Sequence, residues 1–306
     1  MLQLTATKQI NIIVCILMLT LGSCINCANN CTNQVYNKGL INDTVISNVS
    51  LVKVNSGCYK SGLNCDTKTI DYSFWIGKYE VTNKQFFTFL TEALKKQVLF
   101  IKDKNIYIKY TDDSLLLSDT FCVKYLDNAI YLNPNGELLL NAAYANHPVI
   151  SVTWYGADAF CKYYGFKLPS ANEWEKAARG NNCTRFSWGN DVNSSYANYF
   201  NSHDPYEPGT TPVGFYNGKI HQGFKTHDAV SPYGCYDMAG NAWEWTRDKF
   251  SPQSQYYFGK GGGFNLHTAA SLQVYYVSTF RVNEVVPPLD CTHLSDGFRV
   301  VKHINN

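Results

Sequence analysis

The sequence is poor in charge. Asp, Glu, Lys and Arg together make up 16% of its 306 residues, and the formal net charge is +2. No acidic or basic tail stands out, and the footprint of clustered Lys and Arg that marks nucleic-acid-binding domains is absent. Nucleic acid is therefore not expected among the partners of this protein.

Motifs of several enzyme classes are missing too. The sequence has no GxSxG nucleophile motif, no phosphate-binding loop and no dinucleotide-binding glycine fingerprint. The 7 histidines show no HxxxH or facial-triad spacing, and no CxxC is matched by a second one at zinc-ligand spacing. The enzyme classes that depend on these motifs are therefore not indicated.

The N-terminal residues are typical of an export signal. Lys8 is the only charge before residue 24, and residues 10–21 form an apolar run that is too short to span a bilayer. The following LGSC, residues 21–24, resembles a bacterial lipobox, in which Cys24 is lipidated and becomes the mature N-terminus. Cleavage after small residues, giving a soluble secreted protein, is the alternative. We expect a signal peptide over residues 1–23 and a lipoprotein held at the bacterial cell surface, in the outer membrane.

Export would allow disulfide bonds to persist. Of 11 cysteines, 9 remain once Cys15 and Cys24 are set aside (11 − 2 = 9). Because this number is odd, at least one is free or pairs between chains. Cys58 and Cys65 are near enough in sequence to close a small loop, but the sequence does not assign the pairs.

Residues 24–50 are rich in Asn, Thr and Ser and are predicted to be a tether, with one domain over residues 51–304. Residues 73–81 are rich in aromatic and β-branched residues, which predicts a strand. Short apolar runs between residues 98 and 146 alternate with turn signals and predict hairpins. Residues 181–260 show no sustained period and are expected to be rich in loops.

Three helices are predicted from their capping signals. Thr82 and Gln85 form a capping box before the first helix. A second helix is expected from about Trp154 to Tyr164, with Gly165 as its C-cap. Ser170 and Glu173 form another capping box, before a short helix that ends at Gly180.

Residues 260–301 have a composition that fits neither a plain helix nor a hairpin. Three consecutive glycines follow Lys260 at the start of the stretch, and GFR, residues 297–299, stands near its end. Between these two motifs, apolar, aromatic and small polar residues follow one another without a steady period. The glycines and GFR are interpreted as fixed scaffold.

Five separated motifs share their order with one family. They are FWIGKYEVT (74–82), HPVISVTW (147–154), KLPSANEWE (167–175), YGCYDMAGNAWEW (233–245) and the GGG…GFR frame. Together they resemble the formylglycine-generating-enzyme-like (sulfatase-modifying factor) domain over about residues 70–302. The resemblance implies an α+β, C-type-lectin-like fold with a short twisted antiparallel sheet, two to three helices and long ordered loops.

The resemblance also implies a structural calcium ion. Its ligands would be the carboxylate of Glu244 and the backbone carbonyls of Asp237, Gly240 and Ala242; hard oxygen ligands of this kind suit calcium. The alternative is that Glu244 caps backbone amides without a metal. A second family site would begin at Asn198, but the loop that follows departs from the family pattern.

Catalysis is not expected. In catalytic members of the family two active-site cysteines follow the glycine frame, and the matching positions here are Leu266 and Ser271. Neither side chain ligates copper as a thiolate, so no redox cofactor is expected. Cys161 matches a helix cysteine whose family partner position is Val300 here, so Cys161 is interpreted as a small buried residue. An oxidoreductase with altered metal ligands is the alternative.

A non-catalytic branch of this fold comprises the variable proteins of diversity-generating retroelements, and the chain is most similar to the treponemal variable surface lipoproteins of that branch. Rewriting of asparagine codons in these proteins yields many residue types, but not Lys, Gln, Glu, Met or Trp. Residues 261–301 contain no Lys, Met or Trp, and only Gln273 and Glu284 break the rule. Chance depletion over a short stretch is the alternative.

The resemblance thus implies a surface-anchored, ligand-binding protein that is diversified over residues 261–301. Its ligand would be an extracellular protein or cell-surface molecule, with the membrane contacted through the N-terminal lipid. Tyr275, Tyr276 and Phe280 are expected to be large contact residues, with core packing as the alternative for each. A fixed adhesion lipoprotein is the other alternative. The predicted ligand-binding residues are Leu266, His267, Thr268, Ala270, Ser271, Tyr275, Tyr276, Phe280, His293 and Leu294.

Overall fold

The computed structural model describes residues 43–102, 105–109, 114–116, 129–281 and 295–304. Cys24, the predicted signal peptide, most of the predicted tether, and His293 and Leu294 lie outside the described residues. Within the described part of the chain, every helix is too short or too polar to cross a membrane.

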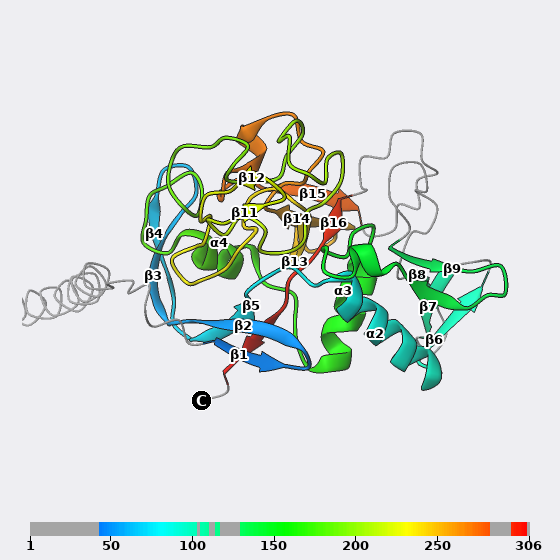
Figure 1. The fold of residues 1–306 in the computed structure, drawn as a ribbon. Coiled ribbons are helices and arrows are strands. Elements are labelled where there is room, and N and C mark those ends of the chain that lie inside the picture. Colours follow the sequence, from blue (N-terminus) through cyan, green and yellow to red (C-terminus); the bar gives the residue numbers. More distant parts are fainter. Residues whose placement is uncertain (1–42, 103–104, 110–113, 117–128, 282–294, 305–306) are drawn as a thin grey trace, which may run out of the picture.

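The first sheet joins the two ends of the domain. Its four strands lie in the order β1-β2-β5-β17, and all neighbours are antiparallel (Figure 1). β1 begins at Asp43, before the predicted domain boundary at residue 51, because it pairs with β2 across a tight turn. β5 ends at Gly77, earlier than predicted; beyond it, Val81 donates its N–H to the carbonyl of Phe298. The strand bounds are β1 Asp43–Ile46, β2 Val49–Val54, β5 Phe74–Gly77 and β17 Val301–His303.

The three predicted helices are present with the predicted caps. α2 (Asn83–Lys95) follows a capping box of Thr82 and Gln85, and α4 (Ala171–Arg179) follows one of Ser170 and Glu173. α3 (Trp154–Tyr164) ends at Gly165, whose φ of 72° is left-handed and suits glycine. These predictions are confirmed. The sequence reveals such caps because capping depends on residues three positions apart.

The second sheet includes strands from residues 260–301, which we call the C-terminal stretch. Its strands lie in the order β15-β14-β13-β16, and β16 runs parallel to β13 (Figure 1). β13 and β14 fall within the region that was predicted to be rich in loops. The first four residues of β13 are all buried, so the strand lacks the alternation by which half-buried strands are found. The bounds are β13 Trp243–Lys249, β14 Tyr256–Lys260, β15 Ser278–Arg281 and β16 Asp296–Gly297.

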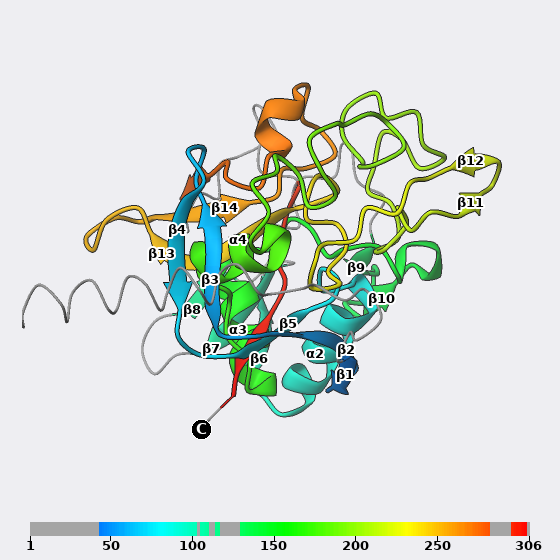
Figure 2. The same ribbon diagram turned by 90° about the vertical axis from the view of Figure 1, so that its left-hand side faces the viewer.

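Short hairpins complete the fold. The hairpins expected between residues 98 and 146 are present as β6-β7-β8 and as β9-β10, and the β11-β12 hairpin projects from the loop-rich part of the chain (Figure 2). The bounds are β3 Gly57–Ser61, β4 Asp66–Ile70, β6 Leu99–Lys102, β7 Asn105–Lys109, β8 Ser114–Leu116, β9 Ile130–Leu132, β10 Leu138–Leu140, β11 Ile220–His221 and β12 Phe224–Lys225. Two 3-10 helices are η1 (Ala142–Tyr144) and η2 (Ala269–Leu272).

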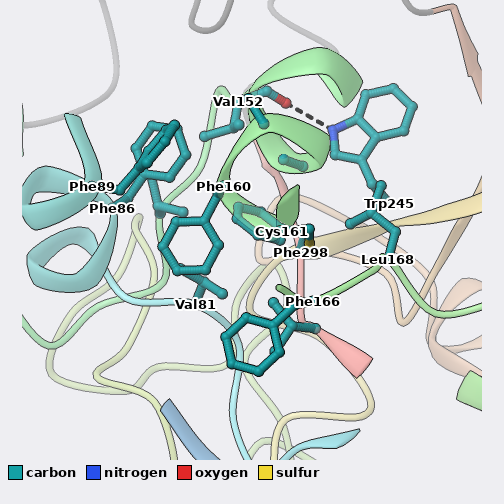
Figure 3. Packing of buried hydrophobic residues seen from close by; sticks show 14 of the residues in the cluster. Val81, Phe86, Phe89, Val152, Phe160, Cys161, Phe166, Leu168, Trp245 and Phe298 are labelled. Carbon is teal, nitrogen blue, oxygen red and sulfur yellow. Dashed lines mark hydrogen bonds between the residues drawn. The ribbon is translucent and has the colours of Figure 1, made fainter. Parts of the chain in front are cut away.

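The main core forms where α2 and α3 meet the GFR motif. Phe86, Phe160 and Phe298 are buried and pack ring against ring (Figure 3). Trp245 is buried in the same cluster and donates its indole N–H to the carbonyl of Val152 at 2.7 Å. The phenylalanine of GFR is therefore scaffold, as the sequence predicted.

The described cysteines differ in their bonding. Cys65 is bonded to Cys183, which links the β3–β4 hairpin to the loop after α4. Cys58 is also disulfide-bonded, so the two cysteines are not partners of each other. Cys161 is a free, fully buried thiol, and its pKa is raised by burial, in agreement with its interpretation as a small core residue.

Candidate ligand-binding surface

The backbone of the C-terminal stretch is shaped first by glycine. Gly261 and Gly262 have φ values of 90° and 79°. A β-carbon at Gly262 would lie 2.6 Å from Leu272 Cδ2, and one at Gly263 would lie 2.6 Å from Ser295 Oγ. The turn after β14 therefore requires glycine for its conformation and for the closeness of its neighbours.

Main-chain hydrogen bonds then hold residues 261–281 in place. β15 pairs with β14, and the loop between them is tied at four further points to elements outside it. These bonds need no particular side chain, so the backbone course does not depend on which residues occupy the exposed positions. The four hydrogen bonds outside the strand pairing are Gly240 N to Gly261 O (2.9 Å), Phe264 N to Asn241 O (3.0 Å), Phe200 N to Leu266 O (3.1 Å) and Val274 N to Arg185 O (2.8 Å).

Several side chains of the stretch point into the core. Leu272 and Val274 are fully buried, and Phe264 is nearly so. Leu266 is half-buried and packs against two of the hydrophobic clusters. Tyr275 is half-buried as well: it packs against the cluster around Trp174, with the Arg179 guanidinium 5.7 Å from its ring centre. Leu266 and Tyr275 thus contribute partly to the core. For Tyr275, core packing was the alternative to ligand contact in the sequence analysis.

Other predicted residues lie at the surface. His267, Thr268, Ala270 and Tyr276 are exposed, and Ser271 is half-buried with its hydroxyl 3.4 Å from that of Thr268. We call the exposed side chains of His267, Thr268, Ala270, Tyr276 and Val277 the C-terminal face. Phe280 lies on β15 opposite Tyr257, and its side chain falls outside the description.

Two exposed neighbours were missed by the sequence interpretation. Val277 is within the stretch, and Phe200, from the loop before Ser202, has its ring centre 3.8 Å from that of His267. No local pattern distinguishes Phe200 from a core phenylalanine. Its position became visible only through the contact with a residue far along the chain.

The residues expected to bind calcium form a different arrangement. Glu244 is fully buried, and its two carboxylate oxygens accept bonds from Arg299 Nε and Nη2, both at 2.6 Å, and from Trp174 Nε1 at 2.7 Å. Arg299 Nη2 also lies 3.4 Å from the backbone carbonyl of Asp237. A guanidinium cation therefore already stands between two of the expected ligands.

Other residues of the two expected calcium sites have hydrogen bonds of their own within the protein. Gly240 and Ala242 donate their N–H groups to Gly261 O and Glu80 Oε1. Asn198 is buried and donates its amide to the Gly209 carbonyl. Among the described residues, no group of three or more His, Cys, Asp or Glu side chains is placed to hold a metal ion. The Glu244 carboxylate, already bonded to Arg299 and Trp174, does not fit a calcium ion bound by the same oxygens.

Two more buried carboxylates lie around this ion pair. Burial raises the pKa of Glu80 well above its usual range, and the negative charges of Asp237 and Glu244 add to the effect. Burial likewise raises the pKa of Asp237 to about 6, against the stabilising bond from the Gly214 N–H. Asn241 and Ala242 donate hydrogen bonds to Glu80. We call Glu80, Asp237, Glu244 and Arg299, with these hydrogen-bond donors, the polar framework.

Lys260, the last residue of β14, is a buried cation next to this framework. Its Nζ has no hydrogen-bond partner among the described residues, lies 3.9 Å from Glu175 Oε2 and stands 5.3 Å from the centre of the Trp174 ring. Burial lowers its pKa to about 8. Folding therefore disfavours the protonated form of Lys260 relative to the unfolded chain.

Lys260→Met is expected to stabilise the protein by about 1–3 kcal/mol at pH 7, because it removes the cost of a buried charge while keeping the length of the side chain. The folded-state pKa lies below the unfolded value, so the cost is present below about pH 8 and disappears as pH rises toward 10.5. Urea unfolding at pH 7 and pH 10 checks this; the advantage of the variant must shrink at the higher pH. An equal advantage at both values would contradict it.

Comparison with known proteins agrees with this architecture. The family model for the sulfatase-modifying factor enzyme 1-like domain matches residues 40–304, and the chain belongs to this family. The match starts before residue 51 and includes β1. The fold is α+β and C-type-lectin-like, as the sequence predicted.

Two relatives of known name match part of this chain, and the matched part makes up a different share of each relative. The chain is similar to serine/threonine-protein kinase pkn1 of Chlamydia caviae (33% identity over 178 residues, 58% of this chain and 23% of the kinase). It is also similar to the formylglycine-generating enzyme of Mus musculus (32% over 191 residues, 59% of this chain and 50% of the enzyme). The matched region thus spans about a quarter to a half of these relatives.

Two solved structures share the fold. PvdO from Pseudomonas aeruginosa superposes with a TM-score of 0.57 at 15% identity, covering 88% of this chain and 99% of that one. Treponema denticola variable protein 1 superposes with a TM-score of 0.52 at 16% identity, covering 87% and 99%. At these identities the likeness concerns the fold alone.

Proposed function

We propose that this protein is a surface-anchored, non-catalytic binding protein whose C-terminal face contacts an extracellular ligand, a protein or another cell-surface molecule. One observation carries the proposal. The backbone of residues 261–281 is held by glycines and main-chain hydrogen bonds, while His267, Thr268 and Tyr276 face solvent. Exposed side chains on a fixed backbone are the arrangement of a binding surface.

The same arrangement favours variation of the ligand. Exposed substitutions usually change stability by less than about 0.5 kcal/mol, so residues such as Thr268 and Ala270 tolerate replacement while the fold persists. Exposed tyrosine, here Tyr276, supplies contact area at a small loss of side-chain entropy. We propose that residues 261–301 are diversified by a retroelement, as the composition of the stretch suggests.

Sequencing the DNA around the coding region tests the diversification. The expected result is a near-copy of the segment that encodes residues 261–301, beside a reverse-transcriptase gene, with differences between the copies confined to adenines. Absence of both features would reject diversification and leave a fixed adhesion lipoprotein, which shares the binding face but not its variation.

Anchoring is proposed to occur through Cys24. Cys24→Ser is expected to abolish lipidation, because the serine hydroxyl does not replace the thiol that carries the lipid, and to move the protein from the membrane fraction to the soluble one. Fractionation of cells that express the full chain, with Cys27→Ser as the matched control, measures the change. Membrane attachment of Cys24→Ser at the wild-type level would contradict lipid anchoring.

A second candidate, an oxidoreductase of the family type, rests on the family membership. The family resemblance assigns Leu266 and Ser271 to the positions of the catalytic cysteines. Both residues border Gly262, whose β-carbon would lie 3.0 Å from Leu266 Cδ1 and 3.0 Å from the backbone oxygen of Ser271. Thiolates at these positions are needed to bind copper, and neither residue supplies one. Purified protein is expected to bind no stoichiometric copper or iron and to form no aldehyde on a cysteine peptide; clear turnover would overturn the non-catalytic proposal.

A further inference from the structure

Phe200 extends the C-terminal face beyond the stretch that is expected to vary. Phe200 is 41% exposed, although phenylalanine is a residue type that is most often buried. Its ring lies against the ring of His267, with 3.8 Å between centres, and its N–H is bonded to the Leu266 carbonyl. Phe200 and His267 therefore form one aromatic surface made from two distant parts of the chain.

The loop that carries Phe200 is fixed on its C-terminal side. The carboxylate of Glu207 accepts the N–H of Asn201 at 2.7 Å and the N–H of His203 at 3.0 Å. Asn201 and His203 both have left-handed φ values, 62° and 57°, which are uncommon for residues other than glycine, and their bonds to the carboxylate support this conformation. Ser202 N is also bonded to the carbonyl of Tyr199.

The N-terminal side is fixed as well. Asn198 is buried, and its carbonyl accepts the N–H of Asn241 at 2.9 Å. Tyr199 packs in the cluster that contains Leu272 and Leu266. The Phe200 ring is thus displayed from a backbone held on both sides, and binding a partner there would not require the loop to be ordered first.

The C-terminal face beside Phe200 carries no formal charge, whereas the Glu207 carboxylate lies on the other side, within the Phe200 loop. Residues 261–280 include no Asp, Glu, Lys or Arg, and the exposed side chains of the C-terminal face are an imidazole, a hydroxyl, a phenol and two aliphatic groups. Polyanions such as nucleic acids are held chiefly by Lys and Arg contacts to phosphate, which this surface does not offer. A rigid aromatic surface with short neutral hydrogen-bonding groups resembles the contact surfaces of antibodies for protein antigens.

We propose that Phe200 is a fixed anchor of the binding face, and that the partner is a protein segment that places an uncharged aromatic or aliphatic side chain against the Phe200–His267 pair. This inference rests on the proposed function, since it assumes that the C-terminal face binds a ligand. Phe200 lies outside residues 261–301, so it contributes a constant contact while His267 and its neighbours set specificity. Anchors of this kind carry a large share of binding energy at protein interfaces.

The probe is a set of random peptides displayed on phage and selected on the immobilised full chain; the tightest binder is synthesised and its Kd measured by calorimetry. Phe200→Ala is expected to weaken binding about tenfold or more. Phe200→Tyr, which keeps the ring, is expected to stay within about threefold of wild type. The matched control is Phe250→Ala, which removes another exposed phenylalanine, on the β13–β14 turn; it should change Kd by less than about twofold.

Further variants distinguish a failure of the Phe200 anchor from a failure of the proposed binding face. If His267→Ala and Tyr276→Ala weaken binding but Phe200→Ala does not, the anchor is wrong and the binding face stands. If none of the three weakens binding, the binding face itself is wrong. Equal losses from Phe200→Ala and Phe250→Ala would indicate nonspecific apolar contact and overturn the anchor. Selected peptides that require charged residues for binding would overturn the neutral partner.

Discussion

Glu244→Gln is expected to lower the free energy of unfolding by about 3–5 kcal/mol. The substitution keeps the shape of the side chain but leaves the Arg299 guanidinium, which is fully buried, without its negative partner. Breaking a buried ion pair by removing one partner costs more than the pair contributes, because the remaining charge stays in a medium of low dielectric. Urea unfolding measures the change.

The control for this variant is Glu137→Gln, at an exposed carboxylate that is bonded to the side chain of Asn133. It is expected to change the free energy of unfolding by less than about 0.5 kcal/mol. Equal stability of Glu244→Gln and wild type would contradict the structural role of the ion pair. A rise in Tm of the wild type on addition of Ca²⁺, lost in Glu244→Gln, would restore calcium as the partner of Glu244.

Leu272→Ala is expected to cost about 2–5 kcal/mol, whereas Thr268→Ala should cost less than about 0.5 kcal/mol. The two residues lie four positions apart in the same stretch, but Leu272 is fully buried and Thr268 is exposed. Removing the Leu272 side chain leaves a cavity beside the Gly262 turn, whose backbone it supports. Urea unfolding of the two variants under the same conditions tests the contrast.

Similar costs for these two variants would contradict the separation between scaffold and face. A large cost for both would mean that Thr268 is held by contacts that its exposure does not reveal. A small cost for both would mean that the stretch unfolds without loss to the core. Either result would remove the physical reason for expecting the exposed positions to vary freely.

The sequence was sufficient where structure depends on local chemistry. The Thr82–Gln85 and Ser170–Glu173 capping boxes and the Gly165 cap place three helix ends, because each signal lies within four residues of its effect. The roles of the glycine turn and of Phe298 were also predicted. Both belong to motifs that the family resemblance brought together.

The features that the sequence did not reveal depend on partners far away in the chain. β1 was assigned to the tether, since a short strand of mixed composition shows itself only when β2 pairs with it. The family resemblance assigned Glu244 to a calcium ion, and the sequence does not reveal that Arg299, which lies 55 residues further on, bonds to its carboxylate. Leu266 and Tyr275 were placed on the face, whereas packing against distant clusters buries part of each.

The most direct test of the account compares two libraries displayed on yeast and treated with protease. In one, His267, Thr268, Ala270 and Tyr276 are randomised together; in the other, the buried residues Leu272, Val274, Phe298 and Val300 are randomised. Most members of the first library are expected to remain folded and resist cleavage, while most members of the second are expected to be cut. Equal resistance of the two libraries would contradict the claim that a fixed scaffold carries a freely variable face.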